Sequence, residues 1–248
     1  MISKYLLILG IAHLLGDFYF QSEKMARKKD KTYKGVLVHC AEYYVVALLV
    51  VLPVFSPGMA AASVLTAFAH FIIDTVKYLF LAKKRMTKKN GRVFVADQCV
   101  HALSIFMLAY LMYDWNFTIG HITIVSRFLT AYGFEPETLA KWLFVVLILH
   151  KPANILIQNL LGAYKPKAED KIIKADNRIG RRIGTMERLI MLAFLSVNQY
   201  TAMGFVLTAK SIARYDKIAK DEKFAEYYLL GTLVSVLCVI LCRMLILN

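Results

Sequence analysis

The run from Tyr43 to Ile73 contains no charged residue, and it restricts the fold of this chain more than any other feature. A helix that crosses a membrane needs about 20 mostly apolar residues, so the run is too long for a single crossing. Pro53, Pro57 and Gly58 interrupt it, and such residues mark turns between helices. The run therefore predicts two membrane-spanning helices joined by a tight turn.

The composition of the whole chain agrees with a membrane protein. Of its 248 residues, 58% are hydrophobic and 19% are charged, and the mean hydropathy is +0.53. Soluble proteins have roughly 45–50% apolar and about 25% charged residues. The 31 Lys and Arg outnumber the 17 Asp and Glu, which gives a formal charge of +14. An apolar but basic chain is typical of a polytopic membrane protein with basic loops.

The same values exclude several other classes of protein. They do not fit a disordered chain, a secreted disulfide scaffold or a collagen-like fibre. A nucleic-acid partner is not expected, because the positive charge lies between apolar runs rather than on a soluble domain. The four Cys residues show no C-x-x-C spacing, which argues against a thiolate zinc ribbon or a redox pair.

Seven segments are long and apolar enough to be spans. We expect an all-α polytopic transmembrane helix bundle of about 6–7 spans, at 2–20, 35–55, 59–82, 93–113, 139–163, 186–209 and 226–247. The first segment contains His13 and Asp17 and lacks a cleavage site, so we expect an uncleaved helix rather than a signal peptide. Lys151-Pro152 predicts a kink or a break in the fifth span.

The pattern also predicts how the chain is divided. We expect a four-helix unit over 1–113, a connecting segment with the kinked fifth span over 114–163, and a basic cytoplasmic loop with a C-terminal helical pair over 164–248. The boundary nearest the C-terminus is expected in the polar stretch 164–185, because no low-complexity linker divides the chain.

The basic residues predict the orientation in the membrane. The loops 24–34 and 83–92 each carry six Lys or Arg residues, and short basic loops face the cytoplasm. We therefore expect the N-terminus outside, the acidic segment 114–138 outside and the basic segment 164–185 inside. The basic loop 210–223 would then face outward, which conflicts with the rule unless one C-terminal segment is re-entrant.

Histidine and aspartate residues interrupt the first four predicted helices at a regular spacing. Three of the six His have an Asp four residues away, in the pairs His13 and Asp17, His70 and Asp74, and Asp97 and His101. Residues four apart share one helix face, so each pair can direct both side chains to one point. An ionised Asp within a membrane helix costs on the order of 2.5–3.5 kcal/mol, and a divalent cation would compensate it.

These pairs and His39 are all expected near the cytoplasmic ends of their helices. The predicted metal ligands are therefore His13, Asp17, His39, His70, Asp74, Asp97 and His101. So many ligands suit two ions roughly 3.5–4 Å apart, although one ion also remains possible. Mixed nitrogen and oxygen ligands favour zinc, with manganese or iron as alternatives. The metal-free alternative is a set of buried His–Asp pairs that join helices; a haem is less favoured, because it needs no Asp partners.

Two polar residues next to the predicted ligands are candidates for substrate binding. Gln21 continues the face of His13 and Asp17, and Lys77 follows Asp74 by three residues. Either side chain can bind substrate or steady a ligand. The alternative for Lys77 is that its ammonium group extends to the membrane interface.

Basic residues nearer the C-terminus are further candidates for substrate binding. Arg182 and Arg188 belong to a basic group at the start of a predicted span. They could clamp a phosphate, or instead anchor the helix to anionic head groups. Gln98 adjoins Asp97 in sequence but is expected off its helix face, so we assign it no role.

Several short strings resemble a known family. HLLGDFYFQ (13–21), HFIIDTVK (70–77) and DQCVH (97–101) are similar, in this order, to motifs of a bacterial membrane family catalogued as domain of unknown function 3307. IGTMERL (183–189), AKSIARY (209–215) and EYYLLGTLVS (226–235) resemble segments that accompany the domain in longer members. The resemblance implies a multi-pass protein of the bacterial inner (cytoplasmic) membrane. It implies no activity, and the similarity of the His/Asp arrangement to membrane-bound metal-dependent hydrolases is an analogy.

The leading functional hypothesis is a membrane-embedded metal-dependent hydrolase at the cytoplasmic interface. Its expected substrate is an anionic amphiphile, such as a membrane lipid phosphate or a lipid-linked intermediate, with Asp17 or Asp97 as general base. A divalent-cation transporter is the first alternative, although transport sites usually lie near the midplane and basic loops repel cations. A non-catalytic scaffold with a structural metal, whose basic loops dock a partner, is the second.

Overall fold

The computed structural model describes residues 2–84, 91–120, 123–162 and 170–247, with only the backbone described at 2, 81–84, 123–126 and 170–178. The predicted features that fall on 85–90, 121–122 and 163–169, including most of the basic loop 83–92, lie outside the described residues.

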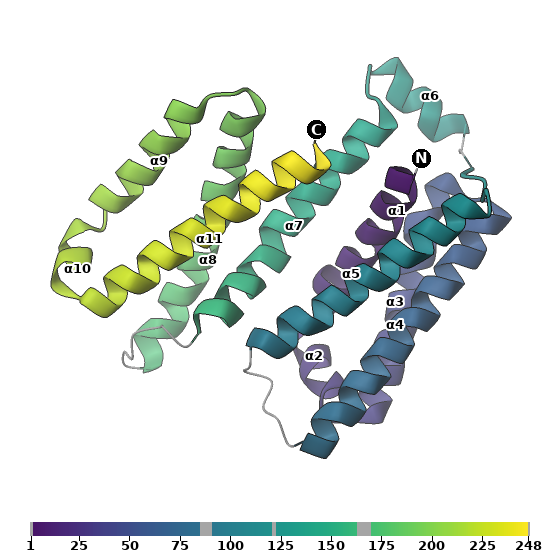
Figure 1. Cartoon of the computed structure of the whole chain (residues 1–248), viewed down its shortest axis with the longest axis horizontal. Helices are drawn as coiled ribbons and strands as arrows, with labels where there is room; N and C mark the ends of the chain where they lie inside the picture. The colour runs from purple at the N-terminus through teal and green to yellow at the C-terminus, as the bar shows by residue number, and fades with distance from the viewer. Residues whose placement is uncertain (1, 85–90, 121–122, 163–169, 248) are drawn as a thin grey trace. The chain divides into compact units, whose positions relative to one another are not determined.

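The described chain is helical and contains no strand, which confirms the all-α prediction. Helices α1 to α11 follow one another with two short segments of other helix type, η1 and η2 (Figure 1). Their bounds are α1 Ile2–Leu14, η1 Leu15–Phe20, α2 Glu23–Lys29, α3 Tyr33–Val51, η2 Leu52–Val54, α4 Pro57–Lys84, α5 Gly91–Asp114, α6 Thr123–Ala131, α7 Pro136–Leu161, α8 Asp170–Ser196, α9 Tyr200–Ile212, α10 Tyr215–Lys220 and α11 Glu222–Ile246.

Five helices within the described ranges are long and apolar enough to cross a membrane. They cover Tyr33–Val54, Pro57–Phe80, Gly91–Asp114, Pro136–Leu161 and Glu222–Ile246. Large apolar side chains point outward from them: Leu49, Phe68 and Leu103 are 55%, 59% and 62% exposed. Contiguous apolar surface of this kind suits contact with lipid. The prediction of a helix bundle is therefore confirmed, and five helices that could cross a membrane are roughly consistent with the predicted 6–7 spans.

Two of the predicted spans have a different structure. The segment 2–20 is a 13-residue α-helix followed by the π-helical segment η1. The segment 186–209 is not one helix, because α8 ends at Ser196 and α9 begins at Tyr200. Asn198 between them has a φ of 58°, a left-handed conformation that Asn tolerates and that ends a helix. The predicted break at Pro152 is absent, since α7 continues through it.

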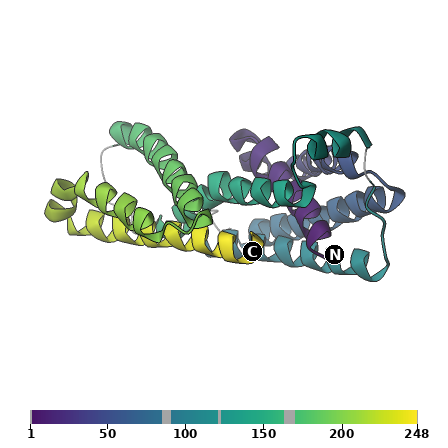
Figure 2. The same cartoon turned by 90° about the horizontal axis from the view of Figure 1, so that it is seen from above.

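The chain forms two compact units, residues 1–144 and 145–248. In the first unit, α1, α3, α4 and α5 pack on one another (Figures 1 and 2). Its apolar core includes Tyr5 and Leu9 of α1, Met59 of α4 and Ala109 of α5, all buried. These residues lie early in α1 and α4 and late in α5, so the core occupies one end of the bundle. The histidines and aspartates lie beyond this core, from the middle of α4 and α5, where His70 and His101 are, toward the opposite end.

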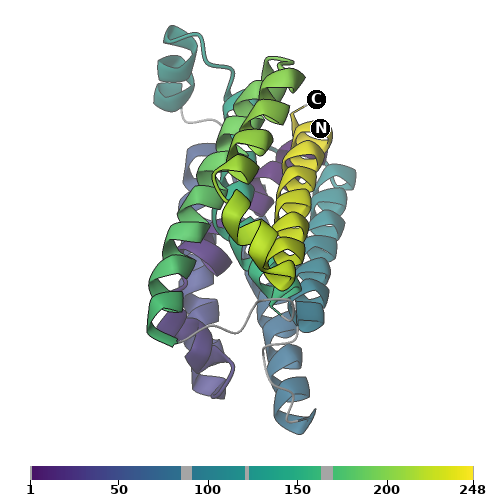
Figure 3. The same ribbon diagram turned by 90° about the vertical axis from the view of Figure 1, so that its left-hand side faces the viewer.

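In the second unit, α9 folds back against α8, and α11 packs on α8 (Figure 3). The short helix α10 connects α9 to α11 and packs on α11. Asp221 caps α11 by accepting a hydrogen bond from the backbone nitrogen of Phe224 at 3.0 Å. The boundary between the two units falls inside the segment 114–163 that the sequence predicts as a connection.

Candidate metal centre

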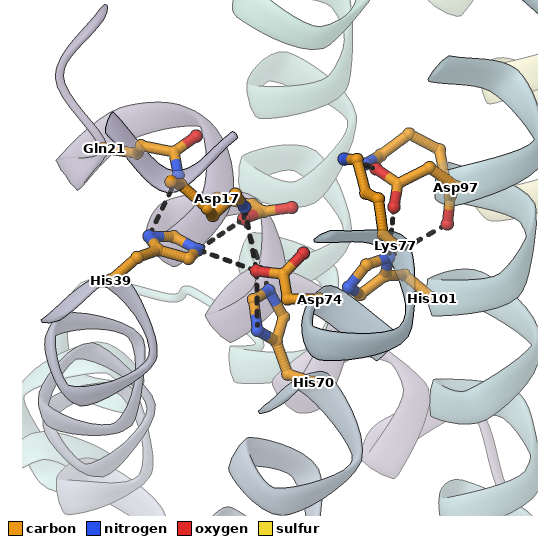
Figure 4. Close-up of polar contacts among 10 residues, drawn as sticks. Asp17, Gln21, His39, His70, Asp74, Lys77, Asp97 and His101 are labelled. Carbon is orange, nitrogen blue, oxygen red and sulfur yellow. Dashed lines mark hydrogen bonds and ion pairs between the residues drawn. The ribbon is translucent and has the colours of Figure 1, made fainter. Parts of the chain in front are cut away.

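The seven predicted ligands come together in the first unit, and Figure 4 labels all of them except His13. His13 lies at the end of α1 and Asp17 in η1, and the antiparallel α3, α4 and α5 bring the other five to the same depth. The imidazole rings form a close group: the His70 centroid is 4.7 Å from that of His101 and 5.3 Å from that of His39. All seven side chains are buried or nearly so. The pattern of four-residue spacings therefore predicted a real spatial cluster.

Two groups of potential ligands can be distinguished within the cluster. Asp17, His39, His70 and Asp74 have ligand atoms within 4.8 Å of one another, and so do Asp74, Asp97 and His101. We call the first group the Lys29 subsite, after a lysine that contacts it, and the second group the His101 subsite. Asp74 belongs to both, as a carboxylate with two oxygens can.

In the Lys29 subsite, hydrogen bonds join the members to one another and to Lys29, while Nδ1 of His70 and Oδ1 of the shared Asp74 have no partner among the described residues. Oδ1 of Asp17 is 2.9 Å from Nε2 of His39 and 3.3 Å from Nε2 of His70. The Lys29 ammonium donates to Oδ2 of Asp74 at 2.9 Å and lies 3.5 Å from Oδ1 of Asp17. A buried cation thus already neutralises much of the carboxylate charge in this subsite.

The His101 subsite contains buried polar atoms without a partner. In the described part of the chain, Oδ1 of Asp74, Oδ1 of Asp97 and Nε2 of His101 accept and donate no hydrogen bond. His101 Nδ1 lies 2.9 Å from the backbone oxygen of Asp97, which can only accept, so Nδ1 carries the proton. In the neutral ring, Nε2 then presents a lone pair. Nδ1 bonded to a carbonyl and Nε2 free is the usual arrangement of a metal-binding histidine.

The donor set therefore fits a divalent cation. Two carboxylate oxygens and an imidazole nitrogen, buried and unpaired, offer the mixed ligands that zinc, manganese and iron accept. The ring of His13 stacks on that of His101 with centroids 5.0 Å apart, and it lies beside this subsite rather than in either group.

Aromatic packing and the π-helical segment position the cluster. Tyr43 of α3 stacks on His70 with centroids 3.8 Å apart, which fixes the plane of that ring. Gly16 of η1 lies against the same tyrosine, because a Cβ at this position would be 2.6 Å from the ring. The π-helical turn contains an extra residue relative to an α-turn, and it directs Asp17 toward His39 and His70 on other helices.

Lys29 is a member of the site that the sequence did not identify. It is the last residue of α2 and only 6% exposed. Burial alone would lower the pKa of Lys29, but the charges of Asp17 and Asp74 raise it above its ordinary value, so it is held as an ammonium ion. In the sequence it is one of six basic residues in the loop 24–34, and nothing distinguishes it from its exposed neighbours.

The turn between α2 and α3 holds Lys29 in place. Thr32 donates to the backbone oxygen of Lys28 through both its nitrogen, at 3.0 Å, and its Oγ1, at 3.1 Å. Gly35 allows α3 to lie against this turn, because a Cβ there would be 2.5 Å from the same Lys28 oxygen. The turn is thus tightly packed at the residue that precedes Lys29.

The two predicted substrate-binding residues near the ligands contact those ligands directly. The Gln21 amide nitrogen donates to Nδ1 of His39 at 2.9 Å, which supports the prediction that it steadies a ligand. Lys77 donates to Oδ2 of Asp97 at 2.7 Å while its side chain stays 20% exposed. Gln98, to which we assigned no role, also donates to Asp97 Oδ2, at 3.3 Å, and interacts with His13.

The two arginines belong to the second unit and have different surroundings. Arg182 is exposed on α8. Arg188 is 1% exposed, and it donates to the backbone oxygen of Leu149 at 2.8 Å and to side-chain oxygens of Asn154, Thr185 and Ser235. These protein acceptors occupy the guanidinium, which argues against a phosphate clamp at Arg188; the clamp stays a prediction. Burial of a charge requires such saturation.

Comparisons with known proteins give one family. A family model described as "Protein of unknown function (DUF3307)" matches residues 5–130, a range that includes all seven predicted ligands, Lys29 and Lys77. No curated protein and no solved structure matches the chain.

Proposed function

The chain belongs to the family of proteins of unknown function DUF3307, and from its site we propose that it is a membrane-embedded metal-dependent hydrolase. The substrate we propose is an anionic amphiphile of the lipid-phosphate type. The metal is one divalent cation or two, with zinc as the first choice and manganese or iron as alternatives.

The observation that carries this proposal is the set of unpaired atoms in the His101 subsite. A buried polar group without a partner costs about 1–3 kcal/mol, and more when it is charged. Asp74, Asp97 and His101 each leave one such atom within a group whose ligand atoms lie within 4.8 Å of one another. A cation held by Asp74 and His101, with a water that donates to Asp97, would remove the cost, whereas a purely structural cluster would be expected to satisfy these atoms by itself.

The residues around the subsite support hydrolysis. A bound divalent metal would lower the pKa of a coordinated water and polarise a phosphoryl or carbonyl oxygen. Of the two candidate general bases, Asp97 fits better than Asp17. Oδ1 of Asp17 is surrounded by Lys29, His39 and His70, which weakens it as a base, whereas Oδ1 of Asp97 has no hydrogen-bond partner within the described residues. Lys77 orients Asp97 through its other oxygen.

Charge and surroundings support an anionic amphiphilic substrate. The centre lies within a bundle in which α3, α4 and α5 are apolar enough to cross a membrane, and it extends from the middle of these helices to α2. The partly exposed Lys77 stands at the cluster, and Lys24, Arg27 and Lys28 are exposed on the adjacent helix α2. Cationic groups beside a buried site attract a phosphate head group, and apolar helix surfaces accommodate its lipid chains.

The proposal can be tested on the purified full-length chain in detergent. Bound metal is measured by mass spectrometry, and hydrolysis is measured on a panel of lipid phosphates. Asp97→Asn is expected to reduce hydrolysis by about a hundredfold or more, the usual size of a general-base effect. Asp114→Asn, which removes an exposed carboxylate at the far end of the same helix, is the matched control and should keep full activity. Full activity in an Asp74→Ala, Asp97→Ala double variant would contradict the proposal.

The same preparation discriminates the two alternative functions. Metal flux into proteoliposomes that is lost in His70→Ala, without hydrolysis, would establish a transporter. Unfolding of the first unit on metal removal, without flux or hydrolysis, would establish a structural metal. The location of the ligands does not separate the functions, because transport sites usually lie near the membrane midplane and His70 and His101 lie within about two residues of the midpoints of the candidate spans Pro57–Phe80 and Gly91–Asp114. The flux measurement therefore decides between them.

A further inference from the structure

Building on the proposed metal site, we infer that Lys29 takes the place of a second metal ion. The centre then binds one divalent cation, in the His101 subsite, while the Lys29 ammonium provides the second positive charge in the Lys29 subsite. The number of ligands alone allows one or two metal ions, and a lysine in the second position reduces the number to one.

The first argument is the difference in hydrogen bonding between His39 in the Lys29 subsite and His101 in the other subsite. Gln21 donates to Nδ1 of His39, so Nε2 of that ring carries the proton and donates to Asp17 at 2.9 Å. A metal at Nε2 would require this proton to leave and the Gln21 amide to turn. In the His101 subsite, by contrast, the proton of His101 is already on Nδ1, and Nε2 is buried without a partner.

The second argument is the position of the ammonium group. Nζ of Lys29 lies 2.9 Å from Asp74 and 3.5 Å from Asp17, the two carboxylates that any ion in the Lys29 subsite would have to bind. His39 and His70 complete the surroundings, since Nε2 of each ring lies within 3.3 Å of the same Asp17 oxygen. An ion at this point and the ammonium group would compete for the same oxygens.

The third argument is the charge of the buried centre. The carboxylates of Asp17, Asp74 and Asp97 face the ammonium groups of Lys29 and Lys77, which leaves one net negative charge when the imidazoles are neutral. One divalent ion changes this to one net positive charge, and two divalent ions would give three net positive charges. An excess of that size within a membrane bundle is strongly unfavourable without further anions.

The fourth argument is that Lys29 is not free to withdraw. The hydrogen bonds from Thr32 to Lys28 hold the turn that follows α2, and Gly35 packs directly against it. The backbone thus delivers the lysine into the bundle. A lysine ammonium has three donors and uses two on Asp74 and Asp17, so the third can donate to an anionic oxygen of the substrate.

The test is the number of zinc ions bound per chain. The full-length protein in detergent is equilibrated with Zn²⁺, freed of excess by dialysis and analysed by mass spectrometry, with hydrolysis measured in the same sample. We expect one ion in the wild type, two in Lys29→Met, and one in Lys29→Arg, which keeps the charge. Lys28→Met, which removes the exposed neighbouring lysine, is the matched control and should bind one ion.

A second measurement uses the wild type alone and does not depend on the folding of a variant. Amine acylation followed by peptide mass spectrometry should leave Lys29 protected both without and with zinc. Reaction of Lys29 on addition of zinc, or two ions bound to the wild type, would overturn the inference. Lys29→Met that melts like the wild type but binds one ion would overturn it too.

Failure of this inference is distinguishable from failure of the proposed function. Two ions with hydrolysis in the wild type would reject the role of Lys29 and keep the hydrolase. One ion in the wild type and two in Lys29→Met, without hydrolysis of any lipid phosphate, would keep the role of Lys29 and reject the hydrolase. No bound zinc, manganese or iron in the wild type after equilibration with each metal, together with no hydrolysis of any lipid phosphate, would reject both.

Discussion

Oδ1 of Asp17 connects more of the site than any other single atom in the contacts described above. It lies within 3.5 Å of Lys29, His39 and His70, which come from three different helices. Asp17→Asn keeps the shape but removes the charge that compensates the buried ammonium. Removal of one partner from a buried ion pair typically costs about 3–5 kcal/mol. We expect the free energy of unfolding of the metal-free protein to fall by roughly this amount.

Denaturation of the chelator-treated protein in detergent measures this effect, with Asp114→Asn as the exposed control. A change below about 0.5 kcal/mol, the range of ordinary surface substitutions, would show that the contacts of Asp17 contribute little. In that case the cluster would depend on bound metal, rather than on its own ion pairs, for its stability.

At the scale of residues, the sequence predicts site residues where a charged or polar side chain would be energetically costly to bury in its apolar surroundings. Aspartates inside apolar runs need a partner, and the four-residue spacing shows which face they share. Lys29 has no such signal, because a lysine in a basic loop looks like a solvated side chain until α2 is seen to fold against the bundle. Gln98 was missed because the helix-face argument considers only its own helix, whereas His13 approaches it from α1.

Gly35 is the position at which one methyl group should disturb the arrangement of two helices. Gly35→Ala would place a Cβ 2.5 Å from the backbone oxygen of Lys28, and a backbone atom cannot move aside as a flexible side chain can. Overpacking of this kind costs about 1–3 kcal/mol. We expect α2 to shift away from α3, so that Lys29 becomes reactive toward an amine-acylating reagent and the melting temperature falls.

Gly204→Ala is the matched control for this substitution. Gly204 lies within α9 with open space where a Cβ would be, so alanine should be neutral or stabilise by about 0.5–1 kcal/mol. Unchanged protection of Lys29 in Gly35→Ala would show that the turn yields without moving α2.

At the scale of elements, the sequence predicts length and hydropathy but not the local geometry of the helices. The apolar runs matched α3, α4, α5, α7 and α11, because spans are set by the thickness of the hydrocarbon layer. The change from α to π at Leu15 has no hydropathy signal, and it coincides with the close contact of Gly16 with Tyr43. The break between α8 and α9 likewise depends on one left-handed residue, Asn198.

In the whole molecule, the C-terminal unit has a buried polar network of its own. Arg188 connects α8 to α7 through Leu149 and Asn154 and to α11 through Ser235. Arg188→Met keeps much of the volume but leaves these acceptors unpaired, and each buried unpaired group costs about 1–3 kcal/mol. We expect a clear loss of thermal stability with unchanged zinc content and unchanged KM for the substrate. A raised KM at unchanged stability would instead restore the predicted phosphate clamp.

The hairpin of α8 and α9 offers a solution to the conflict in predicted orientation. A helix of 13 residues such as α9 is about 20 Å long, too short for a hydrocarbon core of about 30 Å. If α8 and α9 enter the membrane and return, the basic segments 164–185 and 210–223 lie on the same side. Both then share the side of the basic loop 24–34, as the positive-inside rule requires.

Cysteine labelling tests this topology in a background that lacks the four native cysteines. We expect Tyr132→Cys, in the segment between α6 and α7, to react with a membrane-impermeant maleimide in intact cells. Lys28→Cys and Lys220→Cys should react only after permeabilisation, because a re-entrant hairpin keeps both on the inner side. Reaction of both Lys220→Cys and Tyr132→Cys in intact cells would mean that α8 and α9 together cross the membrane once and do not form a re-entrant hairpin. If Lys28→Cys and Lys220→Cys reacted in intact cells and Tyr132→Cys reacted only after permeabilisation, the hairpin would be supported. Only the predicted orientation of the N-terminus would then be wrong.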